Sequence, residues 1–407
     1  MCSVQTTTHS TAWRAAFTLS LAAGMAAATI VQFLFGVLAP LLIDEFGISR
    51  SRLGLLTTAA FVVGGIISPS AGGLVDRIGG RRVFVVSMVL MAIAIAAMSA
   101  APSYLWMLFG ASLAGFTLAS CNPTTNKLIS AHTAVGERGV IMGVKQAGVQ
   151  FGAFAVGFTL PAAAGWFGWR GAMAMTTVLP LACAAAVLVL VPHDRREQLA
   201  HRPEAEAKEV RPLVAWLSTY AFLMGGGVAI VGTYLPLYAR EEVGFSVSSA
   251  GMLAGIIGLI GIASRIAWGW ATERIGDYPL ALGILGIGAV IASLATLLSP
   301  EAGPWMIWTA AILFGLTAIT WNAIGMLAIV AEVGTHAAGR ASGLVQSGFY
   351  GGFVVTPALF GYSVDRTDQW TWGWWGALAM FAGSAVVAFS WLVSRRHGRR
   401  VEIIETV

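Results

Sequence analysis

The stretch Gly72-Gly-Leu-Val-Asp-Arg-Ile-Gly-Gly-Arg-Arg82 lies between two long apolar runs and decides how the rest of the chain is arranged. It places one acid, three arginines and four glycines in eleven residues. A short segment with so many charges cannot lie in hydrocarbon, so the chain leaves a membrane here and turns back into it. Short loops rich in arginine face the cytoplasm, which predicts the side of the membrane on which this loop lies.

The composition of the whole chain indicates a polytopic membrane protein. Of its 407 residues, 57% are apolar and 11% are charged, whereas soluble domains carry about 25% charged residues. The net charge of +5 comes from basic residues in predicted loops and tails, so we expect no nucleic-acid partner. No disulfide framework, catalytic triad, nucleotide-binding loop or metal cluster is recognisable, and we expect neither an enzyme nor a cofactor nor a bound metal.

Twelve apolar runs are long enough to span a bilayer, which takes about 20 residues. They centre on residues 15–41, 53–75, 83–101, 104–130, 139–164, 170–191, 213–239, 248–271, 280–298, 305–331, 339–362 and 372–394. We therefore predict an all-α polytopic membrane protein with twelve transmembrane helices. Its predicted parts are a six-helix bundle (1–192), a cytoplasmic linker (193–211), a second six-helix bundle (212–394) and a cytoplasmic tail (395–407). Both termini are expected in the cytoplasm.

The two halves of the chain repeat each other. Residues 44–79 align without a gap with residues 241–276, and residues 115–152 align with residues 315–352. The first loop returns in the second half as Gly269-Trp-Ala-Thr-Glu-Arg-Ile-Gly276. Two pseudo-symmetric halves of this kind are predicted to enclose a site near the middle of the membrane, whose access alternates between the two sides.

The first loop matches the signature G-x-L-x-D-R-x-G-x-R-R, and the chain therefore resembles the major facilitator superfamily. The resemblance implies transport by rocking of the two halves, with spans 1, 2, 4, 5, 7, 8, 10 and 11 around a central cavity. It also implies a gating latch in which Asp76 pairs with basic residues of its own loop and faces the start of the eleventh span. The residues assigned to this latch are Asp76, Arg77, Arg81, Glu273, Arg274 and Arg340.

Positions that differ between the two halves predict where an asymmetric substrate binds. Ser68 in the first half is matched by Arg265 in the second. Lys127 and Lys145 are matched by apolar residues, and no acid lies in the middle of any span. A charge at the centre of a membrane helix costs roughly 2.5–3.5 kcal/mol, so an unpaired one indicates function. The alternatives are that Arg265 bonds carbonyls of a neighbouring helix and that the lysines reach the membrane surface.

An anionic substrate would supply the missing counter-charge, with Arg265 as its main ligand and Lys145 assisting. Neutral polar side chains on the same spans would orient the rest of the substrate. The predicted substrate-binding residues are Arg265, Lys145, Lys127, Gln32, Asn122, Asn126, Gln146, Tyr234, Asn322, Gln346 and Tyr350. Interhelical hydrogen bonds are an equal alternative for the asparagines and glutamines that occupy matched positions of the two halves.

Two branches of the superfamily share local features with this chain. Arg265 resembles the arginine on the eighth span that holds the anion in monocarboxylate, oxalate and nitrate carriers. The oxalate carrier has a second cation on the eleventh span, where this chain has Val345 and Gln346. Asn126-Lys127 and Gly143-Val-Lys-Gln-Ala-Gly148 resemble instead the cyanate-permease-like branch. The Gly-Pro pair of drug–proton antiporters is missing from the fifth span.

The sequence thus predicts a secondary transporter of a small organic anion, a monocarboxylate, in the cytoplasmic membrane. Proton symport or anion exchange would drive it, so its partners are the substrate, the bilayer and, for symport, protons; a monomer is expected. One alternative is proton-coupled efflux of a drug or metabolite, which an aromatic and apolar cavity around Arg265 would favour. The other is a transporter-like sensor.

Overall fold

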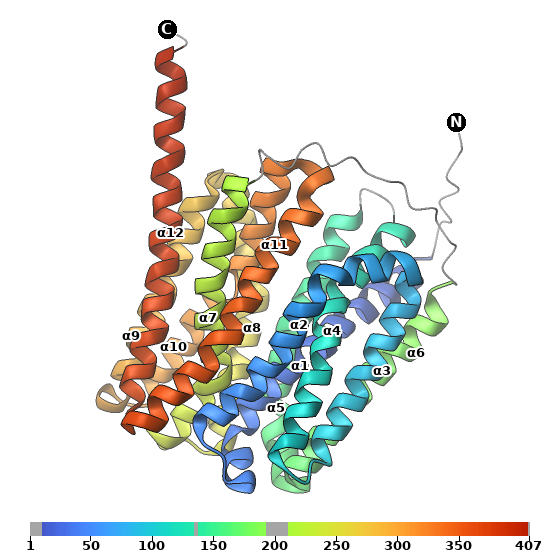
Figure 1. Cartoon of the computed structure of the whole chain (residues 1–407), viewed down its shortest axis with the longest axis vertical. Coiled ribbons are helices and arrows are strands. Elements are labelled where there is room, and N and C mark those ends of the chain that lie inside the picture. Colours follow the sequence, from blue (N-terminus) through green and yellow to red (C-terminus); the bar gives the residue numbers. More distant parts are fainter. Residues whose placement is uncertain (1–9, 134–136, 193–210, 406–407) are drawn as a thin grey trace.

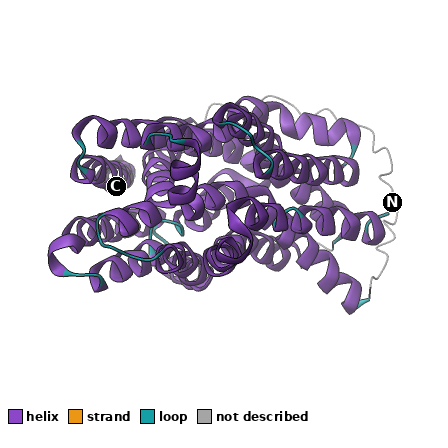
Figure 2. Cartoon of the chain, turned by 90° about the horizontal axis from the view of Figure 1, so that it is seen from below, coloured by secondary structure: helices purple, strands orange, loops and turns teal. Residues whose placement is uncertain are grey.

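The computed structural model describes residues 10–133, 137–192 and 211–405, which form helices and short connections without a strand (Figures 1 and 2). The helices are α1 (Thr11–Phe46), α2 (Arg50–Ile78), α3 (Gly80–Ser99), α4 (Tyr104–His132), α5 (Arg138–Met175), α6 (Val178–Leu190), α7 (Arg211–Glu241), α8 (Val247–Ile275), α9 (Tyr278–Ala302), α10 (Trp305–Leu316), α11 (Trp321–Thr367) and α12 (Trp370–Glu405). The prediction of an all-α protein is confirmed. The predicted linker lies outside the described residues except for Arg211.

Ten helical stretches of the described chain are long and apolar enough to cross a membrane. One of them, Val140–Leu190, is 51 residues long and contains the predicted fifth and sixth spans. Gly168 separates these two spans, because its φ of +67° lies in the left-handed region that glycine adopts without a Cβ penalty. The predicted tail, residues 395–407, is not separate from the twelfth helix, because α12 continues as a helix to Glu405.

The predicted tenth span is interrupted between α10 and α11, at residues 317–320. The interrupting sequence is Thr-Ala-Ile-Thr, and its β-branched residues have lower helix propensity than unbranched ones. The second half of the span belongs to α11, which is 47 residues long. A straight helix of that length would measure about 70 Å, against a hydrocarbon core of about 30 Å. Helix α11 is therefore longer than one membrane crossing requires, although the predicted eleventh span, 339–362, is not among the ten stretches.

Side chains of α8 bind backbone carbonyls at this interruption. The Ser264 hydroxyl donates to the carbonyl of Gly315 at 2.8 Å, and the indole N–H of Trp268 donates to that of Leu316 at 3.0 Å. In a membrane a carbonyl released from a helix must find a partner inside the protein. Helix α8 thus stabilises the interruption that lies beside the cavity described below.

Helices α1–α6 lie on one side of the molecule and α7–α12 on the other (Figure 1). Within the first group α1 packs on α5, α2 on α4, and α3 on α4 and α6; within the second, α7 packs on α11 and α12, and α9 on α10 and α12. The groups contact each other mainly through α2 with α11, α5 with α8, and α1 with α7. The predicted division of the chain into two six-helix bundles stays a proposal, and this packing supports it.

The two groups approach most closely away from the chain ends. We call the side where α1 begins and α12 ends the terminal side, and the other the distal side (Figure 1). Toward the distal side, a Cβ added to Gly157 of α5 would lie 2.2 Å from the nitrogen of Gly255 in α8. A Cβ on Gly36 of α1 would lie 2.0 Å from the carbonyl oxygen of Gly232 in α7. Only residues without a side chain permit these helix contacts.

Candidate functional site

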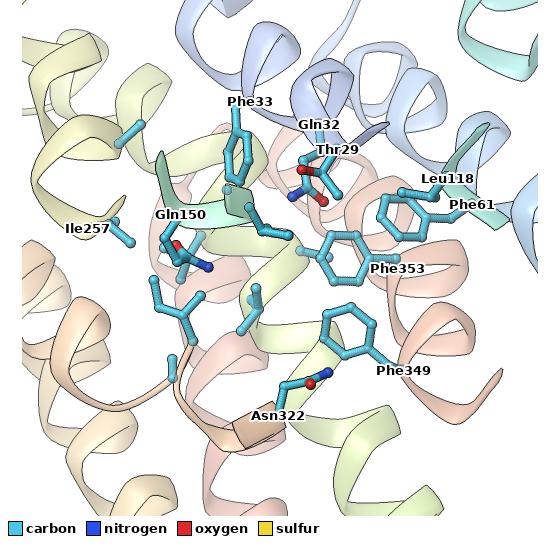
Figure 3. A pocket seen from close by; sticks show the side chains of 18 of the residues that line it. Thr29, Gln32, Phe33, Phe61, Leu118, Gln150, Ile257, Asn322, Phe349 and Phe353 are labelled. Carbon is cyan, nitrogen blue, oxygen red and sulfur yellow. The ribbon is translucent and has the colours of Figure 1, made fainter. Parts of the chain in front are cut away.

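A cavity of about 140 Å³ lies between the two groups of helices. Its lining comes from α1, α2, α4, α5, α7, α8, α10 and α11, which correspond to the spans that the family resemblance placed around a central cavity. Figure 3 shows ten labelled lining residues around this space. Among the described lining residues, Arg265 is the only charged one.

Arg265 of α8 is held by backbone carbonyls of two other segments. Its Nε and Nη2 donate to the carbonyl of Ile319, at 3.3 and 3.2 Å, in the interruption between α10 and α11. Its Nη1 donates to the carbonyl of Gln146 in α5 at 2.9 Å. The bonds to carbonyls that the sequence left open as an alternative are therefore present, and one of them reaches the other group of helices.

These bonds do not use all of the donors of Arg265. A guanidinium has five N–H groups in a fixed plane, and the three bonds leave one N–H on each of Nη1 and Nη2. Two N–H groups on adjacent nitrogens match the two oxygens of a carboxylate. Arg265 thus keeps the donors for an anion while the backbone bonds restrict its orientation.

Lys145 of α5 is fully buried but does not line the cavity. Its ammonium donates to the side-chain oxygens of Asn122 at 2.7 Å and Asn126 at 2.6 Å, both on α4. The bond from Lys145 orients the amide of Asn122, which lines the cavity, and leaves its Nδ2 as a donor. Lys145 therefore affects the cavity through Asn122 and through its charge.

Several other predicted residues meet at the cavity, and some do not. The predicted residues that line it with Arg265 are Gln32, Asn122, Gln146, Asn322, Gln346 and Tyr350. Tyr350 donates to the carbonyl of Leu118 at 3.3 Å. Lys145, Lys127, Asn126 and Tyr234 do not line it.

Lys127 and Asp76 form an ion pair near the terminal side, with 3.0 Å between Nζ and Oδ1. Lys127 also donates to the carbonyl of Val75 at 3.2 Å. The partner that the structure gives to Asp76 thus comes from α4, whereas the sequence placed it among the basic residues of the same loop.

The other predicted latch residues are Arg77 and Arg81 of the first loop, Glu273 and Arg274 of the second, and Arg340 of α11. Arg81 donates to the carbonyl of Leu188 at 2.8 Å, Arg77 is exposed, and the guanidinium of Arg274 lies 3.7 Å from the centre of the Trp270 ring. The side chains of Glu273 and Arg340 lie outside the part of the chain that the structure describes. Their place in the latch stays a prediction.

Sequence reasoning did not assign several lining residues to the site. Phe61 of α2 and Phe353 of α11 stack with ring centres 4.1 Å apart, and Phe33, Phe314 and Phe349 also line the cavity. In a sequence that is apolar nearly throughout, a cavity-facing aromatic residue looks like a lipid-facing one. Gln150 was also missed, although its departure from Tyr350 in the repeat was a usable signal.

The distal side is closed by polar contacts between the two groups. Asp365, near the end of α11, accepts hydrogen bonds from the backbone N–H groups of Arg50 and Ser51, at 2.9 and 2.8 Å, at the start of α2. The side chain of Arg50 pairs with Glu241 of α7 at 2.6 Å. Tyr234, 2.7 Å from the carbonyls of both Arg50 and Pro357, belongs to this closure.

The surroundings of Asp365 change the pKa of its carboxyl. Partial burial raises the pKa of Asp365. The N–H and hydroxyl groups of Ser51, with smaller contributions from Ser49 and the N–H of Arg50, lower it, and together they outweigh the effect of burial. The net pKa of Asp365 lies below the ordinary value. The carboxylate is therefore stabilised by its contact with the start of α2.

Comparisons with known proteins agree with this architecture. A family model described as Major Facilitator Superfamily matches residues 20–351. The chain is 24% identical over 381 residues to the hexuronate transporter of Bacillus subtilis, covering 87% of this chain and 89% of that protein. It is 28% identical over 349 residues to a probable nitrate/nitrite transporter of Mycobacterium tuberculosis, covering 83% and 86%.

A similar fold is present in a solved structure of a bacterial homologue of the human lysosomal transporter Spinster, in an inward-facing and occupied conformation. The TM-score is 0.75 at 17% identity, covering 95% of this chain and 98% of that one. At this identity the likeness concerns the fold alone.

Proposed function

This chain belongs to the Major Facilitator Superfamily, and we propose that it carries a small organic anion, a monocarboxylate, by alternating access through the cavity around Arg265. The observation that carries the proposal is the charge of the lining: one guanidinium, and no acid among the described lining residues. Hexuronate and nitrate, named in two relatives, are also anions, which supports an anionic cargo.

In this proposal each polar group has a separate task. The two remaining N–H groups of Arg265 bind the carboxylate, and the Nδ2 of Asn122 donates a further hydrogen bond. Lys145 fixes the amide of Asn122 and adds a positive charge nearby. The aromatic pair Phe61 and Phe353 contacts the apolar part of the substrate.

The direction of access follows from where the two groups are joined. In the described part of the chain, the ion pair between the groups, Arg50–Glu241, lies on the distal side, and the other ion pairs stay within one group. We take this conformation as open toward the terminal side, which the arginine-rich loop assigns to the cytoplasm of a bacterial inner membrane. The latch around Asp76 would form when the terminal side closes.

A thermal-shift series on the purified protein tests the proposal. Anions that bind the folded state raise the melting temperature by an amount that grows with the logarithm of one plus their concentration over Kd. We expect stabilisation by monocarboxylates and none by their neutral amides, and we expect the Arg265→Ser variant to lose this difference. Equal stabilisation by carboxylates and amides would contradict an anion carrier.

Efflux of a drug or metabolite is the second candidate, because aromatic residues contribute much of the lining. A binding preference for large uncharged aromatic compounds over carboxylates in the same thermal-shift series would favour efflux.

A further inference from the structure

Among the described residues that line the cavity, Gln150 of α5 has a side-chain oxygen that is buried and lacks a hydrogen-bond partner. The residue is 2% exposed and lines the cavity, with its amide directed into the space (Figure 3). Its Oε1 is buried and has no hydrogen-bond partner in the described structure. Buried polar atoms without a partner are rare because each costs about 1–3 kcal/mol. The oxygen itself is enclosed by the surrounding protein, so a turn of the amide that brings it toward the cavity would give it the ligand partner that it lacks.

The position of Gln150 in the repeat makes its unpaired oxygen more informative. The matched residue of the second half, Tyr350, lines the same cavity, but its hydroxyl already donates to the carbonyl of Leu118. Packing between the halves therefore gives the hydroxyl of Tyr350 a hydrogen-bond partner, whereas the amide oxygen of Gln150 at the matched position has none. An asymmetric substrate requires such a difference between the two halves.

The surroundings of Gln150 place it close to the charged end of the cavity. A Cβ added to Gly261 of α8 would lie 3.2 Å from the Gln150 Oε1, so the amide packs directly against Gly261. Gly261 and Arg265 are four residues apart on α8 and share one helix face. On α5, Gln150 lies one turn after Gln146, whose carbonyl binds Arg265. Both helices thus place the amide about one turn from the guanidinium.

We propose that Gln150 accepts a hydrogen bond from a hydroxyl group of the substrate, so that the protein prefers hydroxylated carboxylates to their deoxy analogues. The inference rests on the proposed function, since Arg265 must hold the carboxylate for Gln150 to reach its hydroxyl. A neutral hydroxyl fits better than an ammonium here, because a second cation beside Arg265 would be repelled.

The test uses the purified full-length protein and three pairs of probes. The pairs are lactate and propionate, 3-hydroxybutyrate and butyrate, and 4-hydroxybenzoate and benzoate, which place the hydroxyl at increasing distances from the carboxylate. Dissociation constants are measured for wild type, for Gln150→Met, which keeps the length but removes the amide, and for Gln150→Ala as a second variant. Tyr350→Phe removes the polar group at the matched position.

In wild type we expect at least one hydroxylated probe to bind about fivefold to a hundredfold more tightly than its deoxy analogue. The reason is that the deoxy analogue leaves the amide oxygen of Gln150 without a hydrogen bond. In Gln150→Met and Gln150→Ala that ratio falls to about one, while the deoxy probe binds with nearly unchanged affinity. Tyr350→Phe changes both members of a pair equally and preserves the ratio.

The outcomes separate this inference from the proposal on which it rests. If carboxylates bind in an Arg265-dependent way but no pair is discriminated, or if Gln150→Met keeps the ratio, the role of Gln150 is overturned and the anion carrier stands. If no carboxylate binds wild type, both are overturned.

Discussion

Arg265 donates to two backbone carbonyls and also lines the cavity, so its replacement is expected to change both stability and anion affinity. Loss of a charge-assisted hydrogen bond costs about 1.5–3 kcal/mol, or about tenfold to a hundredfold in affinity. Arg265→Ser should show this loss for every anion that wild type binds. Arg265→Lys keeps the charge without the planar fork and should recover part of it.

A matched control separates the two roles of Arg265. Ser264→Ala removes a neighbouring bond to the same helix interruption, to the carbonyl of Gly315, without touching the charge. It should lower the melting temperature and leave anion affinity unchanged. If Arg265→Ser behaves in the same way, with unchanged anion affinity, Arg265 is a structural residue.

Lys145 carries a buried charge, and its bonds in the described part of the chain go to two amide oxygens. Unit charges roughly 10 Å apart interact by about 1.7 kcal/mol at an effective dielectric constant of about 20, so Lys145→Met should weaken anion binding by about tenfold. Because the side-chain oxygens of Asn122 and Asn126 lose their charged donor, the melting temperature should also fall. Titration with an anion and its neutral amide measures the effect; equal weakening of both would exclude an electrostatic role.

Among the elements, the contact of α11 with the start of α2 is expected to depend on pH. The folded-state pKa of Asp365 is lowered, so its contribution is complete above the ordinary pKa of Asp, about 3.9, and is lost as pH falls through the lowered value. The distal closure should therefore loosen only in strong acid. Asp365→Asn should loosen it at neutral pH, because an amide cannot replace both carboxylate oxygens as acceptors.

Distances between spin labels on the distal ends of α2 and α11 report this change. We expect a longer distance in Asp365→Asn at pH 7 and a smaller further change on acidification than in wild type, because the variant has lost this carboxylate. Glu241→Gln provides the comparison, since it removes the ion pair with Arg50 but keeps the bonds to Asp365. An unchanged distance in Asp365→Asn would show that the glycine contacts alone close the distal side.

For the whole molecule, alternating access predicts opposite effects of two acids on opposite sides. Asp365→Asn loosens the distal side, whereas Asp76→Asn removes the ion pair with Lys127 and the proposed latch of the terminal side. Asp76→Asn should therefore keep the substrate affinity of each state but favour the conformation described here. Labelling of cavity cysteines from each side of a membrane measures the two populations, and a shift in the same direction for both variants would contradict the latch.

Energy coupling is also a property of the whole molecule. No described acid lines the cavity, and Glu332 pairs with Arg395 at the terminal side. In liposomes loaded with unlabelled substrate, anion exchange should give rapid uptake without a pH gradient. In symport the proton travels with the anion, so uptake into empty liposomes should require a pH gradient. Gradient-driven uptake that one acid-to-amide replacement abolishes would contradict both schemes.

The sequence by itself determined the class of fold and the central cation. Apolar runs of membrane-spanning length leave helices as the way to satisfy the backbone, which is why the all-α prediction holds. The repeat identified Arg265 as the position where the second half departs from a small hydroxyl, and the structure places it in the cavity. Both inferences rest on local composition and spacing, which need no knowledge of packing.

The tertiary structure alone decided which polar groups meet. The interruption at residues 317–320 could not be predicted, because side chains of α8, distant in sequence, bind three of the carbonyls beside it. Lys127 and Lys145 look alike in sequence, yet one pairs with Asp76 and the other with Asn122. Periodicity gives the face of a helix but not its rotation against neighbours, and that rotation leaves the buried oxygen of Gln150, beside the cavity, without a partner.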